Sequence, residues 1–154
     1  MSILTWVPVR GGHLAVSGRP KARAFPTIAS EGATHVLTLL AAKEDAPSLG
    51  KLVESAGMEW IWFPLENGNP LPKARDAEVA SLLGEVKRLL DQNARILIHC
   101  SAGIHRTGMI ANAILRWTGH DAHVAREKLA QLRTITAEGM GDRRLAYALS
   151  LIHI

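Results

Sequence analysis

The stretch RILIHCSAGIHRTG, residues 95–108, decides the fold. Its first five residues, 95–99, contain a continuous aliphatic run that predicts a short buried strand. The next residues, 100–106, include small and flexible side chains and predict a tight loop. An apolar helix is expected from Thr107 to Thr118. A strand, a loop and a helix in this order indicate an α/β domain in which ligands bind beyond the carboxyl ends of the strands.

Apolar strands and amphipathic helices also alternate on both sides of this stretch. Parallel neighbouring strands need crossover helices, so this alternation predicts an α/β fold with a central, mainly parallel sheet of about four to five strands flanked by helices. The expected strands are His35–Leu40 and Glu59–Leu65, and the expected helices are Pro26–Glu31, Pro47–Ala56, Lys73–Gln92, Ala122–Arg133 and Asp142–Ile152.

The N-terminal segment predicts a β-hairpin. Two apolar segments, Trp6–Val9 and His13–Val16, flank Gly11 and Gly12, a pair typical of a tight turn. We expect this hairpin to form a small antiparallel cap.

Length and composition indicate one globular domain over residues 1–154. Hydrophobic residues make up 47% of the chain and charged residues 21%, which is enough for one core. No stretch approaches 18 consecutive apolar residues, so a membrane span is not expected. The N-terminus has no pattern of a secretory signal, and we expect a cytoplasmic protein.

The charge and the cysteine content narrow the function further. A net charge of +4 leans mildly towards anionic partners, but aromatic and basic residues do not alternate, so nucleic-acid binding is not predicted. Cys100 is the only cysteine, which excludes an internal disulfide and points to a reducing compartment. A single cysteine is either a small buried side chain or a reactive group.

The position of Cys100 favours the reactive group. It directly follows the expected strand, where successive backbone N–H groups of the loop can converge on an anion and stabilise a thiolate. Arg106 can hold two phosphate oxygens with its planar guanidinium. Thr107 can donate a hydrogen bond to the sulfur, and His99 is expected to orient the loop.

The sequence HCSAGIHRTG resembles the H-C-x5-R-[ST]-G signature of cysteine-dependent protein tyrosine and dual-specificity phosphatases. The segment WVPVRGGHLAVSGRP, residues 6–20, is similar to the start of the small atypical dual-specificity type. The resemblance implies a phosphatase-type phosphate loop, a phosphocysteine intermediate on Cys100, and no metal or organic cofactor. The residues it assigns to substrate phosphate are Ser101, Ala102, Gly103, Ile104, His105 and Arg106.

The general acid of this family has no clear counterpart in the chain. The family uses an Asp about thirty residues before the cysteine, and the matching position holds Asn67, which cannot supply the proton. Glu66 is the nearest substitute and our candidate. Asp76 and His105 are weaker candidates, and the acid is absent in a further alternative.

Basic residues elsewhere in the chain allow contacts with a multiply phosphorylated substrate. Arg19, Arg143 and Arg144 could each approach the phosphate. The alternative for the segment Thr134–Arg144 is a surface turn and helix cap. Likewise His120, Asp121 and His123 could suggest a metal, but their spacing lacks further ligands and favours a solvated helix face.

Three functions therefore remain open at this stage. The first is a phosphatase acting on a phosphorylated protein or a small phosphorylated molecule such as a phosphoinositide or inositol phosphate. The second is a phosphate-binding pseudophosphatase module, weakly active because of Asn67. The third is sulfur or arsenate chemistry on a similar loop, which the pattern of His99, Arg106 and Thr107 disfavours. The sequence does not indicate an oligomeric state.

Overall fold

The computed structural model describes residues 3–151 and contains a five-stranded sheet. Its strands lie in the order β1-β2-β5-β3-β4, and β2, β5, β3 and β4 are parallel to one another. This confirms the predicted mainly parallel α/β sheet. The strands are β1 (Val7–Val9), β2 (Gly12–Ser17), β3 (His35–Thr38), β4 (Glu59–Trp62) and β5 (Arg95–His99).

The predicted antiparallel N-terminal hairpin forms, but it belongs to the main sheet and is not a cap on it. β1 and β2 do form an antiparallel hairpin, but β2 then pairs along its whole other edge with β5. Leu14, Ala15 and Val16 are all buried, because helices cover both faces of the sheet. Leu14 and Val16 belong to one apolar cluster and Ala15 to the other. A continuous apolar run is typical of a strand covered on both faces.

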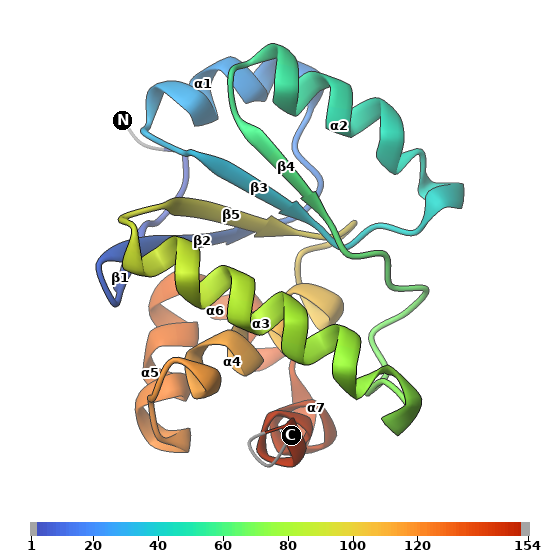
Figure 1. Ribbon diagram of the computed structural model, residues 1–154, viewed down its shortest axis with the longest axis vertical. Coiled ribbons are helices and arrows are strands. Elements are labelled where there is room, and N and C mark those ends of the chain that lie inside the picture. Colours follow the sequence, from blue (N-terminus) through green and yellow to red (C-terminus); the bar gives the residue numbers. More distant parts are fainter. Residues whose placement is uncertain (1–2, 152–154) are drawn as a thin grey trace.

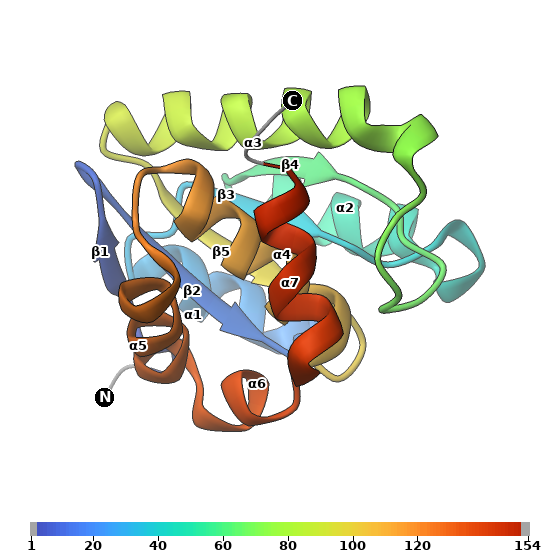
Figure 2. The same cartoon turned by 90° about the horizontal axis from the view of Figure 1, so that it is seen from below.

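Helices cover both faces of the sheet (Figure 1). α1 and α2 lie on one face, and α3 to α7 lie on the other, as the view from below also shows (Figure 2). Two apolar clusters fill the interfaces, one around Phe25, Val36 and Leu97 and a larger one around Leu37 and Ile98. The helices are α1 (Phe25–Ser30), α2 (Ala46–Ser55), α3 (Asp76–Asp91), α4 (His105–Trp117), α5 (Ala122–Leu132), α6 (Thr134–Glu138) and α7 (Gly141–Leu151), with short 3-10 helices η1 (Ala22–Ala24), η2 (Ala42–Glu44) and η3 (Lys73–Arg75).

Several boundaries differ from the sequence prediction. β3 and β4 end at Thr38 and Trp62, earlier than expected, because the apolar residues that follow remain buried but leave the regular ladder. The C-terminal helix was predicted to end at Ile152, which lies outside the described residues. The predicted helices at 47–56, 73–92 and 122–133 all form, with shifts at their ends.

Two elements next to the site were not predicted. α6 contains Thr134, Ile135 and Thr136, whose β-branched side chains have low helix propensity. The η2 turn is only three residues long, which is too short to show a periodic pattern. Tertiary contacts, not local propensity, stabilise both segments.

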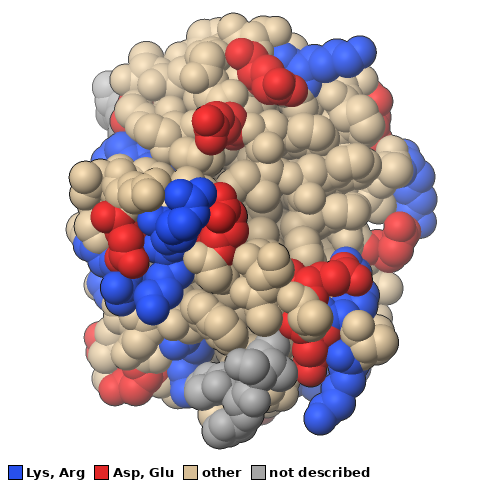
Figure 3. Space-filling model, in the orientation of Figure 1, with Lys and Arg blue, Asp and Glu red and all other residues tan. Residues whose placement is uncertain are grey.

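Within residues 3–151, no helix combines the length and the apolar character that crossing a bilayer requires. On the face shown in Figure 3, basic and acidic side chains lie next to one another, and a broad area where Figure 1 draws β4 carries little charge. Trp6, Trp60 and Trp117 pack against the core. Trp60 stacks on Trp62 at 5.4 Å between ring centroids, and Arg95 lies over the ring of Trp6.

Candidate active site

The loop between β5 and α4 encloses the sulfur of Cys100. Cys100 is buried, and its Sγ accepts hydrogen bonds from Thr107 Oγ1 at 3.0 Å and from the Gly103 backbone N–H at 3.3 Å. Gly103 has a φ of 72°, which allows the loop to curl around the sulfur at little conformational cost. Donors aimed at a sulfur stabilise its thiolate form relative to the thiol.

Arg106 lies at the first turn of α4 and is almost fully buried. Its Nη1 donates to Glu44 Oε1 at 2.6 Å and to the Leu65 carbonyl at 2.9 Å, while Nη2 donates to Glu44 Oε2 and to Ser101 Oγ at 3.0 Å each. This paired contact lowers the pKa of Glu44 to about 2 and raises the pKa of Arg106. Glu44 therefore stays ionised at neutral pH and fixes the plane of the guanidinium.

Sequence reasoning missed Glu44. It lies 62 residues before Arg106, in the η2 turn that follows β3. β3 and β5 are parallel neighbours, so their carboxyl ends meet at one edge of the sheet. The position of Glu44 just beyond a predicted strand was the available signal.

His99, predicted to orient the loop, lies at the end of β5 with no exposed surface. Its Nε2 is 2.8 Å from Thr38 Oγ1, and its Nδ1 is 3.3 Å from the carbonyl oxygen of Cys100. Burial lowers the pKa of His99 to about 4, so the ring is neutral at pH 7.

Neighbouring segments hold the outer side of the loop. Arg133 Nη1 donates to the carbonyl oxygens of Ala102 and Gly103 at 3.0 Å each, and Thr136 Oγ1 also donates to the Gly103 carbonyl. The Arg19 backbone N–H donates to the Ser101 carbonyl at 2.9 Å. Carbonyl groups held outwards leave N–H groups of the loop to face inwards, as anion binding requires.

The loop after β4 lines the other side of the pocket. Glu66 is 70% exposed and its Oε2 lies 3.4 Å from Lys43 Nζ. Asn67 Oδ1 accepts a hydrogen bond from the Asn69 backbone N–H at 2.9 Å. The side chain of Asn67 therefore stabilises the conformation of its own loop. The neighbouring Glu66 supplies the carboxylate of this loop that lines the pocket.

Together these segments form a pocket of about 220 Å³. Of the proposed acids, Glu66 and His105 line it and Asp76, at the start of α3, does not. The lining residues are Glu66, Asn67, Gly68, Cys100, Ser101, Ala102, Ile104, His105 and Arg106.

The three arginines considered for substrate phosphate lie outside this lining. Arg19 donates its Nη1 to the Glu44 carbonyl, and Arg143 donates to Asn69 Oδ1 at 2.9 Å. Arg144 Nε donates to the Gly68 carbonyl at 2.6 Å. The C-terminal segment therefore folds over the site, where its arginines bind the side-chain amide of Asn69 and the backbone of Gly68 in the loop after β4.

The histidines near residue 120 have local partners. His120 Nδ1 lies 2.9 Å from the Leu115 carbonyl at the end of α4, and Asp121 caps α5 by accepting from the Val124 N–H. His123 pairs with Glu127 at 2.8 Å. No group of three or more potential metal-binding side chains occurs in the described part of the chain.

Comparisons with known proteins agree with this geometry. Residues 11–120 match a family model described as "Polymorphic toxin system, DSP-PTPase phosphatase". No curated protein sequence matches the chain.

Solved phosphatase structures share the fold. The kinase associated phosphatase KAP, with its catalytic-site cysteine replaced by serine, has a TM-score of 0.76 at 17% identity, covering 94% of this chain and 90% of that one. Tk-PTP in its active form has a TM-score of 0.71 at 22% identity, covering 90% of both chains. PTPMT1 in complex with PI(5)P has a TM-score of 0.75 at 14% identity, covering 97% of both.

Proposed function

We propose that this chain, which belongs to the DSP-PTPase phosphatase family of polymorphic toxin systems, hydrolyses phosphate monoesters through a phosphocysteine on Cys100. As a member of that family it is a cysteine-dependent phosphatase of the dual-specificity type. The observation that carries the mechanism is the sulfur of Cys100, buried and hydrogen-bonded by Thr107 and Gly103 next to the guanidinium of Arg106.

In the first step, the Cys100 thiolate attacks phosphorus, so that an S–P bond forms and the bond from phosphorus to the leaving oxygen breaks. Arg106 and the N–H groups of residues 101–106 stabilise the charge that spreads over the phosphoryl oxygens. The leaving oxygen takes a proton from Glu66, the carboxyl group that lines the pocket.

In the second step, water attacks phosphorus and the thiolate leaves. Glu66 accepts the proton of that water, and the products are inorganic phosphate and the original enzyme. The hydroxyl of Thr107, 3.0 Å from the sulfur, favours this step because a hydrogen-bonded thiolate is a better leaving group.

The lining of the pocket favours a substrate with a single phosphate group at the site. Arg106 is the only Lys or Arg among the described residues that line it. A second phosphate on the same substrate would therefore meet no further cation in the lining. A phosphoprotein or a small molecule with one accessible phosphate fits this charge pattern better than an inositol polyphosphate.

The test is hydrolysis of p-nitrophenyl phosphate across pH by the wild type, Cys100→Ser and Glu66→Gln. We expect Cys100→Ser to lose activity by about 10⁴-fold or more, as enzymes do without their nucleophile. Acid quenching of the wild type during turnover should show one phosphate attached to Cys100 by peptide mass spectrometry. Glu66→Gln should lose the basic limb of the pH profile and slow alkyl phosphates by roughly 10²–10⁴-fold.

The pseudophosphatase alternative makes the opposite prediction. Asn67 at the position of the expected acid favours it, since asparagine cannot transfer the proton. If wild-type turnover equals that of Cys100→Ser while vanadate still binds, the chain is a phosphate-binding module. Equal rates for Glu66→Gln and wild type on alkyl phosphates would remove Glu66 from the mechanism.

A further inference from the structure

A line of buried and part-buried hydrogen bonds crosses three strands of the sheet and ends at the backbone of Cys100. Trp60 Nε1 donates to Thr38 Oγ1 at 2.8 Å, and Thr38 Oγ1 lies 2.8 Å from His99 Nε2. On the other side of the ring, His99 Nδ1 lies 3.3 Å from the carbonyl oxygen of Cys100. Three neighbouring strands, β4, β3 and β5, thus each contribute one side chain.

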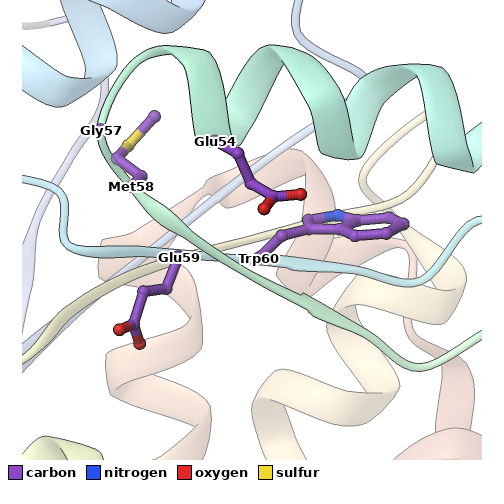
Figure 4. Close-up of a pocket in the computed structure, with 5 residues that line it drawn as sticks. All are labelled: Glu54, Gly57, Met58, Glu59 and Trp60. Atoms are coloured by element: carbon purple, nitrogen blue, oxygen red, sulfur yellow. The ribbon is translucent and has the colours of Figure 1, made fainter.

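Strand register places these side chains in line. Thr38 lies directly opposite His99 in the β3–β5 pair and opposite Trp62 in the β3–β4 pair, so Trp60 is its diagonal neighbour. All four lie on the face of the sheet that α1 and α2 cover, because side chains two residues apart share a face. Figure 4 shows the indole of Trp60 lying beneath α2, while Glu59 points away on the other side of the strand.

Packing holds the outer end of the line. A side chain at Gly50 of α2 would come within 2.5–2.7 Å of the Trp60 ring, so the ring lies directly against the helix backbone. Trp62 stacks on the same ring at an interplanar angle of 15°. The indole therefore has little freedom to turn its N–H away from Thr38.

The chemistry of the groups gives the line a direction. An indole N–H can only donate, so Thr38 Oγ1 accepts from Trp60. The hydroxyl proton of Thr38 finds an acceptor in His99 Nε2, 2.8 Å away. In that arrangement the neutral ring of His99 carries its proton on Nδ1, where it donates to the Cys100 carbonyl.

The opposite tautomer would be unfavourable. With the proton on Nε2, the lone pair of Nδ1 would face the carbonyl oxygen of Cys100 in a buried site, where two unpaired acceptors cost free energy. Burial and the positive charges of Arg19 and Arg106 both keep the ring from taking up a second proton. One arrangement of protons therefore satisfies every contact in the line.

We infer that Thr38 and Trp60 are positioning residues for catalysis, which act by holding His99 as its Nδ1–H tautomer and so fixing the Cys100 peptide. With its carbonyl bound to His99, that peptide keeps the sulfur facing the donors of Gly103 and Thr107. The inference rests on the proposed role of Cys100, but its consequences for the thiolate do not require turnover.

Alkylation of Cys100 by iodoacetamide across pH tests the inference, because Cys100 is the only cysteine in the chain. Thr38→Val keeps the shape of the side chain and removes the hydroxyl. We expect it to shift the midpoint of the alkylation profile upwards by about one pH unit and to lower kcat/KM for p-nitrophenyl phosphate about tenfold. Thr38→Ser should keep the alkylation midpoint and kcat/KM at their wild-type values, because it retains the hydroxyl.

Two tryptophan variants form a matched pair. Trp60→Phe removes the N–H at the start of the line and should shift the profile in the same direction by a smaller amount. Trp62→Phe keeps an aromatic ring that can stack on Trp60 and removes an N–H that donates to the Leu40 carbonyl instead, so it should leave the profile unchanged. Folded Thr38→Val and Trp60→Phe proteins with wild-type alkylation profiles would overturn the inference.

A direct measurement on the wild type covers the case in which a variant does not fold. Nitrogen-15 NMR of the imidazole should show His99 as the Nδ1–H tautomer, and the Nε2–H tautomer would contradict the inference. If the tautomer and the alkylation shifts are as expected but the wild type turns over no substrate, the proposed function fails and the positioning role stands.

Discussion

The loop after β5 and the loop after β4 both line the pocket, but the protein holds them in different ways. Around residues 100–106 the contacts come from several elements and range from buried to exposed, among them those of Glu44, His99 and Arg133. The loop at 66–72 is bound mainly by exposed side chains, and Glu66 is 70% exposed. The loop at 100–106 therefore depends on the whole fold, whereas the loop at 66–72 can change its side chains at little cost in stability.

The largest difference between the two loops should come from the same substitution made on each. Arg106→Lys should lower kcat for p-nitrophenyl phosphate by roughly 10²–10³-fold, because one ammonium cannot replace a planar guanidinium that contacts Glu44, Leu65 and Ser101. Arg144→Lys, which replaces the arginine that donates to the Gly68 carbonyl, should change kcat by less than about threefold, because that hydrogen bond lies outside the lining of the pocket. Equal losses in the two variants would show that both loops are equally constrained.

The next effect is a loss of stability at acidic pH, caused by the buried His99 at the start of the phosphate loop. Burial lowers the pKa of His99 from 6.5 to about 4, so the unfolded state binds a proton in this window that the folded state does not. Stability is therefore full above pH 6.5 and falls as the pH drops towards 4, by about 3 kcal/mol from this group.

Urea unfolding of the wild type and His99→Asn at several pH values measures this contribution. The difference between the two proteins should shrink as the solution is acidified from pH 6.5 to 4. The matched control is His123→Asn, which removes a histidine whose side chain is 83% exposed. A constant difference between wild type and His99→Asn would contradict the prediction.

A smaller effect should follow from closing the space around the phosphate loop. A Cβ at Gly103 would lie 2.3 Å from the backbone of Ser17, at a φ of 72°. Gly103→Ala should therefore lose about 1–3 kcal/mol more stability than Gly57→Ala, which has a φ of 86° but no atom within 4 Å. Thermal unfolding of the two variants separates the steric clash from the backbone strain that both share, and equal melting temperatures would refute the clash.

The smallest effect should be a gain of activity from a substitution in the loop at 66–72. Asn67→Asp keeps an oxygen for the Asn69 N–H and adds a carboxyl group to the pocket lining. We expect kcat/KM for alkyl phosphates to rise about tenfold, below the usual range of general acids because the loop is exposed. Asn69→Asp, whose residue lies outside the lining and binds Arg143, is the control, and an equal change in both variants would contradict a specific role for position 67.

Much of the fold could be predicted because local patterns and the final structure agree. The apolar run before Cys100 became β5, and the alternation of strands and helices became a mainly parallel sheet with helices on both faces. The hairpin was located correctly, but its place in the sheet was not. Strand order depends on which edges meet in space, and a chain pattern does not contain that information.

Cys100, Arg106 and Thr107 could be placed next to one another from their spacing, because all three lie on one short loop and the helix start that follows it. The side chains that surround them depend on the tertiary structure. Glu44, Thr38 and Trp60 reach the loop across parallel strands, and Arg133 and Thr136 reach it from the C-terminal helices. These contacts join residues 22 to 62 positions apart. Those of Glu44, Thr38 and Trp60 exist because neighbouring parallel strands bring their carboxyl ends to one edge of the sheet.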